Sequence, residues 1–547
     1  MLVSEAVGRT LVACGIDHVF GVVGSGNFHV TTAMVAAGAR YVATRHEGGG
    51  ATSADGYARI SGRPTAVSVH QGCGFTNAMT GIAEAAKSRT PLVVVAAEVT
   101  ERRSNFFVDQ EAMARAVGAV PHRVTSAEEA VAQTVAAVAQ AVHGRRTVVL
   151  NLPLPVQGQE VPDGALDGVG LPAAPDPVEP SADDVRRLAA ALATAQRPVF
   201  VAGRGSRSAG AREALRALAD RVGALLATSA VAKGLFSDDP WQIDVSGGFS
   251  SPLAAELVGD ADLIVGWGCA LNMWTMRHGR LIAGGATVVQ VDDTPDAIGA
   301  HRDLTFGVVG DVARTAEAVA GALGEGTRTA YRTPEVGARL GTELRWRDVP
   351  FDDGSGDGRV DPRALSIAID DLLPAERVVA VDSGNFMGYP SMFLSVPDEE
   401  GFCFTQAFQS IGLGLATAIG AALARPDRLP VAALGDGGAL MGAAELETVV
   451  RLGLPMLVVV YDDEAYGAEV HHFGPDGHDL GTVQFPPTGI AAIGRGYGME
   501  AVTVTSVEDL APVAEWVAGG PTGPMLLHAK VTRDEASWWL EEAFKGH

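Results

Sequence analysis

The sequence of 547 residues contains little of several residue types, and each shortage argues against a class of protein. Only four cysteines occur, far apart in the chain: Cys14, Cys73, Cys269 and Cys403. None forms a CxxC pair, which disfavours a disulfide framework or a zinc site and favours a reducing compartment. Lys and Arg total 41 against 65 Asp and Glu, a net charge of −24, so neither nucleic acid nor an anionic membrane is an expected partner.

Long apolar stretches are also missing. No run approaches the ~20 residues that a membrane-spanning helix needs. The N-terminal residues have neither the basic region nor the apolar core of a signal peptide, so we expect a cytoplasmic protein. What is abundant is hydrophobic residues, at 47%, with 67 Gly and 29 Pro spread through the chain, which is typical of an α/β globular protein.

Two stretches rich in Pro, Gly and Asp have the composition of linkers, from about residue 153 to 184 and from about 335 to 361. They predict three domains, at 1–160, 184–334 and 360–547. Short apolar runs alternate with Ala-rich helical stretches, at 65–69, 91–98, 197–203, 261–268, 377–382, 429–436 and 455–463. Continuous apolar strands joined by helices indicate parallel sheets covered on both faces. The predicted fold class is therefore α/β, with three doubly wound parallel-sheet domains whose sites lie at the carboxyl ends of the strands.

The strongest chemical motif follows two strands of the third domain. The first strand runs into Gly-Asp-Gly-Gly at 435–438, and the second ends at Asp462-Asp463. Glycines let the backbone approach a phosphate, and a helix N-terminus offers free N–H groups. Asp436 and Asp463 are hard oxygen ligands on neighbouring strand tips, as Mg²⁺ shared with a diphosphate requires. The alternative is a βα turn with a capping Asp and an exposed acidic turn.

A second candidate phosphate cradle follows strand 377–382. Ser383, Gly384 and Asn385 form a turn there, whose N–H groups and Ser hydroxyl can bind an anion.

The segment 435–467 resembles the diphosphate- and metal-binding motif of thiamine-diphosphate-dependent enzymes, which opens with Gly-Asp-Gly and usually closes on Asn-Asn. The resemblance implies Mg²⁺ as the metal, with Asp436, Asp463 and the Ala465 carbonyl as its ligands. Asp462-Asp463 replaces the two Asn residues. We expect the added negative charge to raise the dependence on Mg²⁺.

Two further motifs carry the same resemblance. Arg45-His46-Glu47 precedes GGGATSADGYAR, as in the family's R-H-E…A-D-G-Y-A-R signature. This implies that Glu47 faces N1′ of the cofactor's aminopyrimidine and promotes removal of the thiazolium C2 proton. Ile411 holds the position of the apolar residue that keeps the cofactor bent. The cofactor-binding residues expected from all motifs are Glu47, Ser383, Gly384, Asn385, Ile411, Gly435, Gly437, Gly438 and Tyr466.

The resemblance covers nearly the whole chain and implies pyrimidine-binding, central and diphosphate-binding domains in that order. In the central domain Gly203-Arg204-Gly205 is a lone GxG. A dinucleotide fingerprint needs a further Gly and an acid about 20 residues on, and both are missing. FAD, which some members of the family bind, is therefore disfavoured but left open.

The residues expected around thiazolium C2 indicate the reaction. Ser25, Glu47 and His70 together resemble benzoylformate decarboxylase, in which a Ser binds the substrate carboxylate and a His relays protons. The second active-site His of that enzyme does not reappear, since Met273 stands in the corresponding place with His278 close by.

Acetolactate synthases differ at two of these positions. They carry Phe-Gln shortly before an Asp, where this chain has Asn105-Phe106 before Asp109, although Gln110 could take a similar role. Their Trp after the metal motif is missing, with His471-His472 nearby. The adjacent His pair of pyruvate decarboxylase is absent from the first domain.

We therefore predict a thiamine-diphosphate- and Mg²⁺-dependent decarboxylase or carboligase for a 2-oxo acid, similar to benzoylformate decarboxylase, with Ser25, Glu47 and His70 as catalytic residues. The alternatives are an acetolactate-synthase-like transferase, a non-catalytic relative, and a flavin- or nicotinamide-linked oxidoreductase on the same fold. Expected partners are a small 2-oxo acid and an aldehyde or keto acceptor. The resemblance implies a homodimer or homotetramer, because family members build each site from two subunits.

Overall fold

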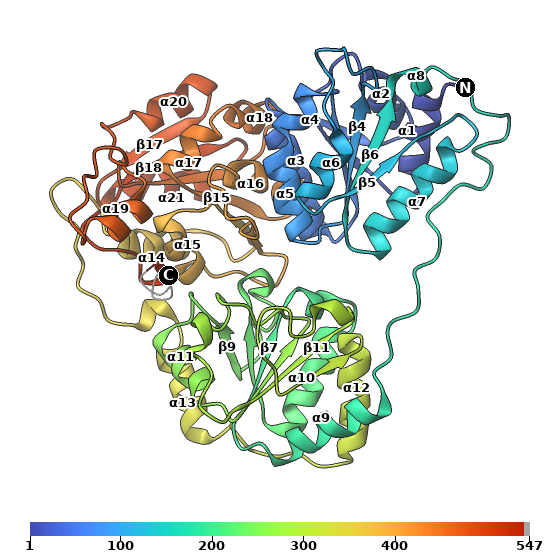
Figure 1. The fold of residues 1–547 in the computed structure, drawn as a ribbon. Coiled ribbons are helices and arrows are strands. Elements are labelled where there is room, and N and C mark those ends of the chain that lie inside the picture. The colour runs from blue at the N-terminus through green and yellow to red at the C-terminus, as the bar shows by residue number, and fades with distance from the viewer. Residues whose placement is uncertain (541–547) are drawn as a thin grey trace.

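The computed structural model describes residues 1–540 and contains three six-stranded, all-parallel sheets with helices between the strands, as predicted. Residues 541–547 of the predicted third domain lie outside the described residues. The first and third domains lie side by side, and the central domain lies below both in the view of Figure 1. None of the described helices combines the length and the hydropathy needed to cross a membrane.

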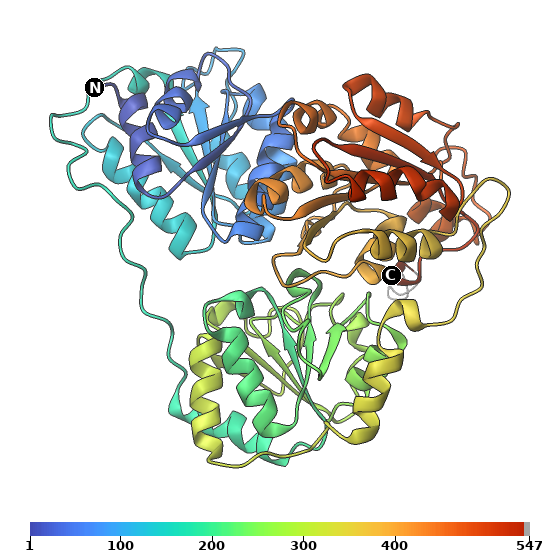
Figure 2. The ribbon, with the colours of Figure 1, turned by 180° about the vertical axis from the view of Figure 1, so that it is seen from behind.

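The first sheet has the strand order β2-β1-β3-β4-β6-β5. Its strands are β1 (His18–Gly21), β2 (Arg40–Ala43), β3 (Thr65–Val69), β4 (Leu92–Glu98), β5 (Val120–Arg123) and β6 (Thr147–Pro153). The helices are α1 (Val3–Ala13), α2 (Phe28–Ala36), α3 (Glu47–Ser61), α4 (Cys73–Asn77), α5 (Met79–Lys87), α6 (Gln110–Ala116), α7 (Ala130–His143) and α8 (Leu154–Gln157). Residues 161–181, which form no helix or strand, run along the outside of the molecule to the central domain (Figures 1 and 2).

The central sheet has the order β12-β11-β10-β7-β8-β9. Its strands are β7 (Pro198–Ala202), β8 (Leu225–Thr228), β9 (Gln242–Val245), β10 (Leu263–Trp267), β11 (Thr287–Asp292) and β12 (Phe306–Val309). The helices are α9 (Ala182–Thr194), α10 (Ala211–Val222), α11 (Pro252–Gly259), α12 (Val312–Leu323) and α13 (Pro334–Glu343). The 3₁₀ helices are η1 (Arg204–Arg207), η2 (Ala230–Ala232), η3 (Arg277–Gly279), η4 (Pro295–Ala297) and, after α13, η5 (Trp346–Asp348).

The third sheet, β14-β13-β15-β16-β18-β17, repeats the strand order of the first. Its strands are β13 (Arg377–Val381), β14 (Phe402–Phe404), β15 (Leu429–Gly435), β16 (Leu457–Asp462), β17 (Glu500–Val504) and β18 (Met525–Lys530). The helices are α14 (Pro362–Leu372), α15 (Gly388–Phe393), α16 (Gly414–Ala424), α17 (Asp436–Met441), α18 (Glu445–Arg451), α19 (Gly467–Phe473), α20 (Ile490–Tyr497) and α21 (Ala511–Ala518), with 3₁₀ helices η6 (Asn385–Met387) and η7 (Val507–Leu510).

The seven apolar runs of the sequence are all interior strands: β3, β4, β7, β10, β13, β15 and β16. Interior strands are covered on both faces and therefore read as continuous apolar runs. Edge strands such as β2 and β17 alternate with polar residues or are partly exposed, which explains why composition does not reveal them.

Both outer sheets have a topological switch point between their second and third strands in space. In the first sheet it lies between β1 and β3, and in the third between β13 and β15. Ligands of open α/β sheets bind outside the carboxyl ends of the strands at such a point. The segments that follow these four strands carry Ser25, His70, Ser383 and Asp436, so the topology places the predicted site residues at two binding crevices.

The first and third domains are joined by close packing of α3 against α16. At Gly56 a Cβ would lie 2.6 Å from the Thr417 carbonyl oxygen, and at Gly420 one would lie 2.0 Å from the Ser53 carbonyl oxygen. The Ser53 hydroxyl donates to the Ala416 carbonyl at 2.9 Å. One apolar core continues from α3 and α5 into α16 and α18, so these two domains form a single packed unit.

Candidate active site

The two strand ends of the predicted metal motif lie side by side. β15 ends at Gly435, α17 begins at Asp436, and β16 runs parallel to β15 with Tyr461 opposite Gly435. Asp436 and Asp463 thus follow neighbouring strands at the same edge of the sheet. They are 8% and 9% exposed.

Asp462, the first residue of the unusual Asp-Asp pair, is neutralised by the protein itself. It is 1% exposed and accepts hydrogen bonds from His528 Nε2 and Lys530 Nζ, both at 2.6 Å. Burial alone would raise the pKa of Asp462, but the His528 ring and the Lys530 ammonium hold this pKa below its ordinary value. The sequence predicts that the negative charge added by the Asp pair raises the dependence on Mg²⁺; in the structure Lys530 balances the part of that charge that Asp462 carries.

Glu464 is neutralised in the same way. Its carboxylate pairs with Arg359 at 2.5 Å and with Lys530 and Arg533 at 3.1 Å each. Although burial would raise it, Lys530 and Arg359 keep the pKa of Glu464 below its ordinary value.

Asp436 and Asp463 have no such partner. Within residues 1–540, no Lys or Arg forms an ion pair with either carboxylate. Burial raises the pKa of both groups, and the nearby negative charges of Asp463 and Asp462 raise that of Asp436 further. Two buried carboxylates near each other are unfavourable when ionised, unless a cation lies between or beside them. Oxygen ligands and a deficit of positive charge are what a divalent cation such as Mg²⁺ fits.

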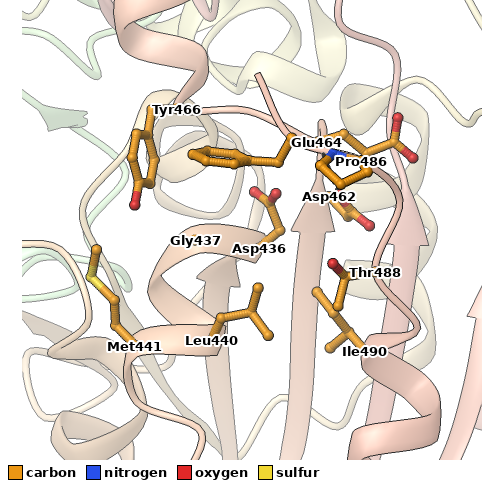
Figure 3. A pocket seen from close by; sticks show the side chains of 11 residues that line it. Asp436, Gly437, Leu440, Met441, Asp462, Glu464, Tyr466, Pro486, Thr488 and Ile490 are labelled. Atoms are coloured by element: carbon orange, nitrogen blue, oxygen red, sulfur yellow. Dashed lines mark hydrogen bonds between the residues drawn. The ribbon is translucent and has the colours of Figure 1, made fainter. Parts of the chain in front are cut away.

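The structure gives Asp436 access to a cavity of about 310 Å³. Figure 3 shows its carboxylate above the first turn of α17, facing the cavity beneath Tyr466 and Glu464. All 11 residues lining this cavity belong to the third domain. Asp463 and Ala465 line a smaller adjoining hollow instead. The described residues contain no cluster of three or more His, Cys, Asp or Glu side chains arranged around a metal. The predicted set of two carboxylates and a carbonyl does not require one.

Ala465 and Tyr466 lie in a backbone segment fixed by its neighbours. Phe485 N–H donates to the Glu464 carbonyl at 2.8 Å, and Tyr466 N–H donates to the Val483 carbonyl at 2.9 Å. The Tyr466 ring stands against the start of α17, because a Cβ at Gly437 would lie 2.7 Å from Tyr466 Cε1.

The turn after β13 meets the start of α17 through Asp382. This residue is fully buried and accepts hydrogen bonds from the N–H groups of Ser383 at 2.8 Å and Gly412 at 3.0 Å. Burial raises the pKa of Asp382 to about 6, against the lowering effect of these N–H donors. A Cβ at Gly438 would lie 2.2 Å from Asp382 Oδ2, so that glycine is needed for this packing as well as for any phosphate approach. Gly384 has φ +139°, a conformation open chiefly to glycine.

Asn385 and Ile411 complete the predicted cofactor residues of the third domain. The Asn385 side-chain oxygen accepts the Ser537 N–H at 3.1 Å. Ile411 is half-buried in residues 405–413, which connect β14 to α16. At the next residue, Gly412, a Cβ would lie 3.0 Å from Met441 Cβ, so this segment lies against the end of α17. The structure therefore gathers the turn at 383–385, Ile411, Asp436 and Tyr466 around the switch point between β13 and β15.

In the first domain, Glu47 begins α3. Its Oε2 accepts a hydrogen bond from the Asn77 amide at 3.0 Å, and the His46 ring caps the helix by accepting the Gly48 N–H at 3.0 Å. A Cβ on Gly74 would lie 3.3 Å from Glu47 Oε1 and 3.0 Å from His70 Cβ. Gly74, at the start of α4, thus lies between Glu47 and His70.

The start of α3 is held by Glu445, a residue of the metal motif at 435–467 whose role the sequence alone does not reveal. Glu445 Oε1 accepts the N–H groups of Arg45 and His46, each at 3.0 Å. Glu445 lies on α18 of the third domain and is 3% exposed. A Cβ at Gly49 would lie 2.4 Å from this oxygen, which explains a glycine there. The metal motif and the Glu47 motif are therefore physically connected within one chain.

Ser25 and His70, two of the predicted catalytic residues, lie next to each other. The Ser25 hydroxyl lies 3.4 Å from His70 Nε2, and His70 Nδ1 lies 3.0 Å from the Gln71 carbonyl oxygen. A carbonyl only accepts, so Nδ1 is the nitrogen that donates to Gln71, and in the neutral ring Nε2 is then the acceptor facing the Ser25 hydroxyl. The exposed Phe106 packs its ring edge-on to His70, with centroids 5.4 Å apart. Neither Ser25 nor His70 nor Glu47 lines the cavity around Asp436.

The glycines of the lone GxG in the central domain are needed for internal packing. A Cβ at Gly203 would lie 2.3 Å from the Gly268 carbonyl oxygen, and one at Gly205 would lie 2.7 Å from Gly268 Cα. The close approach is thus to the turn after β10, and it requires no bound nucleotide to explain it.

Three family models match successive parts of the chain. They are described as thiamine pyrophosphate enzyme, N-terminal TPP binding domain (residues 1–116), central domain (185–319) and C-terminal TPP binding domain (382–529).

Curated relatives match over nearly the full length. A probable 2-ketoarginine decarboxylase of Pseudomonas aeruginosa is 29% identical, over 90% of this chain and 88% of the relative. A sulfoacetaldehyde acetyltransferase of Castellaniella defragrans is 28% identical, over 94% and 90%. The large subunit of acetolactate synthase isozyme 2 of Escherichia coli is 26% identical, over 98% and 97%.

Among solved structures, the thiamine diphosphate-dependent 4-hydroxybenzoylformate decarboxylase of Rhodococcus jostii RHA1 superposes with a TM-score of 0.82. It covers 98% of this chain and 100% of that chain at 23% sequence identity, which demonstrates a common fold.

Proposed function

Because the chain belongs to the thiamine pyrophosphate enzyme family, we propose that it is a Mg²⁺-assisted decarboxylase or carboligase that acts on a 2-oxo acid with thiamine diphosphate as cofactor. One observation carries the proposal. Of the four acidic residues at the carboxyl edge of β15 and β16, only Asp436 and Asp463 lack a cationic partner among the described residues, and these are the two predicted metal ligands.

The third domain would hold the metal and the diphosphate. Asp436, Asp463 and the Ala465 carbonyl supply oxygen ligands, and phosphate oxygens would complete the shell of Mg²⁺. The turn at 383–385, the glycines at 435–438 and Tyr466 border the same crevice. A bound cation would lower the pKa values of both carboxyl groups, which burial raises.

When bound, thiamine diphosphate supplies a carbon nucleophile at thiazolium C2 and accepts the electron pair left when a carboxylate departs as CO₂. Glu47 would hold a proton at the aminopyrimidine N1′ of the bound cofactor. Its Oε2 is already fixed by Asn77, which leaves Oε1 to make that contact. Ile411 would keep the cofactor bent, as in the family.

The Ser25–His70 pair supports decarboxylation. Ser25 lies on the loop after β1, where its hydroxyl can bind a substrate carboxylate. His70 is oriented by the Gln71 carbonyl, so its Nε2 can accept a proton from, or return it to, a group bound beside Ser25. A His that exchanges protons at this place suits release of an aldehyde after CO₂ has left.

The second candidate is a transferase similar to acetolactate synthase or sulfoacetaldehyde acetyltransferase. It is favoured by relatives of both kinds, which match as much of the chain as the decarboxylase does. Against it stands Gln110, the residue that could replace the synthase Gln. Gln110 is 1% exposed, and its side chain is held inside the first domain, where its amide donates to Asn151 at 2.8 Å.

We further propose that each site is completed by a second copy of the chain. The cavity around Asp436 has no wall from the first domain, and Glu47 does not reach it. Large apolar side chains are exposed at both crevices: Phe28 (50%) and Phe106 (45%) beside Ser25 and His70, and Met441 (54%) and Phe485 (42%) beside Asp436. A two-fold dimer would cover both sets with one self-complementary patch.

Cofactor binding is tested by thermal unfolding. Thiamine diphosphate with Mg²⁺ should raise Tm, because a ligand that binds only the native state stabilises it. Asp436→Ala should abolish the shift, whereas Glu47→Gln, distant from the diphosphate, should keep it. No joint shift of the parent protein at saturating cofactor would refute the proposed function.

The reaction is tested by mass spectrometry of products from a panel of 2-oxo acids, each with and without an acceptor aldehyde. We expect CO₂ and an aldehyde in the absence of acceptor. Glu47→Gln serves as the control for uncatalysed loss of CO₂. Products formed only when an acceptor is present would favour the transferase instead.

A further inference from the structure

Residues 405–413, here called the cofactor loop, carry Ile411 and are held by carboxylates from two domains. The loop connects β14 to α16 in the third domain. Near its C-terminal end, the N–H groups of Gly412 and Leu413 donate to Asp382 of the same domain. Near its N-terminal end, the N–H groups of Ala407 and Phe408 donate to Glu84 of the first domain.

Glu84 is a fully buried acid on α5 whose bonds divide unevenly between its two oxygens. Oε1 accepts from Arg59 at 2.7 Å, from Ala407 N–H at 3.0 Å and from the Ser88 hydroxyl at 3.2 Å. Among the described residues, Oε2 accepts from Phe408 N–H alone, at 2.6 Å. Although burial would raise it, Arg59 and these two loop N–H groups hold the pKa of Glu84 below its ordinary value. The carboxylate therefore stays ionised and binds the loop through charge-assisted hydrogen bonds.

Arg59 on α3 binds the other side of the same segment. Its side chain is 7% exposed and pairs with Asp55 as well as Glu84. One guanidinium N–H donates to the Phe404 carbonyl at 2.9 Å, immediately before the loop, and another donates to Ser88. Although burial alone would lower it, Asp55 and Glu84 hold the pKa of Arg59 above its ordinary value.

These bonds are not needed to join the domains. The backbones of α3 and α16 already approach each other closely at Gly56 and Gly420, and the apolar core runs between them. What Arg59 and Glu84 add is specific to the loop, since three of their bonds go to backbone groups of residues 404–408.

We propose that Arg59 and Glu84 are positioning residues that fix the cofactor loop from the first domain, so that Ile411 is presented at the geometry needed to activate the cofactor. This rests on the proposed function, in which Ile411 keeps thiamine diphosphate bent. Neither residue touches the predicted diphosphate or metal ligands. Loss of the clamp should therefore impair activation of thiazolium C2 without impairing binding of the metal and diphosphate.

Glu84→Gln tests this with a minimal change. Because three donors converge on Oε1, the new amide NH₂ takes the place of Oε2 and confronts the Phe408 N–H, donor against donor. Arg59 keeps Asp55 as partner. In cofactor-free protein, we expect faster hydrogen–deuterium exchange of the Ala407 and Phe408 amides, by about ten- to a hundredfold, as for loss of a charge-assisted hydrogen bond. With saturating thiamine diphosphate and Mg²⁺, C2–H exchange should slow by about ten- to a hundredfold, while the Kd for the cofactor stays nearly unchanged.

Asp239→Asn is the matched control. Asp239 is also a buried acid, 5% exposed in its side chain, that accepts from an arginine, Arg216, and from one backbone N–H, that of Trp241. It lies in the central domain and bonds no loop residue, so C2–H exchange should match the parent.

Ser88→Ala removes only the hydroxyl shared by Arg59 and Glu84 and should give a smaller effect in the same direction. If Glu84→Gln fails to fold, the C2–H exchange rate of Ser88→Ala tests the proposal instead.

Unchanged C2–H exchange in Glu84→Gln or, failing that variant, in Ser88→Ala would overturn this inference alone, provided that both bind cofactor. Equal slowing in Asp239→Asn would overturn it too, because the effect would then be general destabilisation. If the parent protein binds no cofactor, the proposed function fails and the inference fails with it.

Discussion

The Glu47 side chain is held in a fixed position, and its Oε1 has no hydrogen-bond partner among the described residues. Asn77 binds Oε2, the His46 cap fixes the first turn of α3, and Glu445 holds the two preceding amides. These contacts come from three separate stretches of sequence, so the side chain is held before any ligand arrives. Such preorganisation is what a proton-transferring carboxylate requires.

Glu47→Gln keeps an acceptor for Asn77 but removes the acid. We expect C2–H exchange of bound thiamine diphosphate to slow by about 10²- to 10⁴-fold, the usual contribution of a general acid or base. Exchange followed by NMR reads this without knowledge of the substrate. Glu111→Gln, the same change at an acid of the first domain paired only with arginines, should exchange at the parental rate. An unaltered rate in Glu47→Gln would remove the residue from its proposed role.

Asp382 gives a prediction on pH. Its folded-state pKa of about 6 lies above the ordinary value of about 3.9 expected when unfolded, because the carboxyl is fully buried. Its protonated form therefore stabilises the fold fully below about pH 4, and this contribution is lost as pH rises through about 6. In the limit the loss is about 3 kcal/mol, from 1.36 kcal/mol per pKa unit.

Asp382→Asn removes the titration. We expect the Tm of the cofactor-free parent to fall relative to that of Asp382→Asn between pH 5 and pH 8, on top of a constant offset from the altered hydrogen bonds. Differential scanning calorimetry at several pH values measures this difference. A Tm difference independent of pH would show that Asp382 does not titrate in this range.

At the scale of elements, the start of α17 is shaped by what it touches. A Cβ at Gly438 would lie 2.2 Å from Asp382 Oδ2, whereas a Cβ at Gly321 in α12 would meet open space. Gly438→Ala should therefore lower Tm and weaken cofactor binding. Gly321→Ala should raise stability by about 0.5–1 kcal/mol, because alanine favours a helix over glycine. Calorimetry and cofactor titration compare the two variants, and equal changes in both would refute the packing role of Gly438.

The helices and strands also show how much of the fold the sequence predicts. The apolar interior strands and the motifs at their ends were predictable, because a strand buried on both faces has a composition of its own and a polar residue after it falls at the sheet edge. Lys530 was not. It neutralises Asp462 because β18 lies next to β16, although 68 residues separate the two in the chain. Nothing local to β18 indicates that neighbour.

Glu84 and Glu445 escaped prediction for a related reason. Each is an ordinary acidic residue on a helix, and each acquires its role by accepting backbone N–H groups from another domain. The farthest donors are 324 residues away for Glu84 and 400 residues away for Glu445. Backbone donors are present at every residue, so they leave no signature in composition. Only the packing of α3 and α5 against α16 and α18 selects which acid meets which amide.

At the scale of the whole molecule, the predicted sites of the first and third domains are in contact within one chain but do not form a single cavity. α3 and α18 touch through Glu445, yet the cavity at Asp436 is walled only by the third domain. In the proposed dimer, a cofactor that contacts both Glu47 and Asp436 lies between the first domain of one chain and the third domain of the other. The exposed Phe106 and Met441 at the respective crevices are the surfaces that such pairing would bury.

Subunit complementation tests this arrangement. Glu47→Gln chains and Asp436→Ala chains should each be inactive alone. When the two are mixed under conditions that allow subunit exchange, a mixed dimer contains one site with both substitutions and one site with both parental residues. If equal amounts of the two chains pair at random in a two-fold dimer, half of the dimers are mixed and half of the sites in those are parental. Total activity should therefore reappear at up to about a quarter of the parental value. Mixing Glu47→Gln chains with Glu47→Gln chains that carry a different affinity tag controls for the exchange procedure and should stay inactive. If tagged mixed dimers are isolated and remain inactive, each site is built within one chain. The first and third domains would then have to move against each other to bring Glu47 and Asp436 to one cofactor. The continuous core between α3 and α16 opposes that movement.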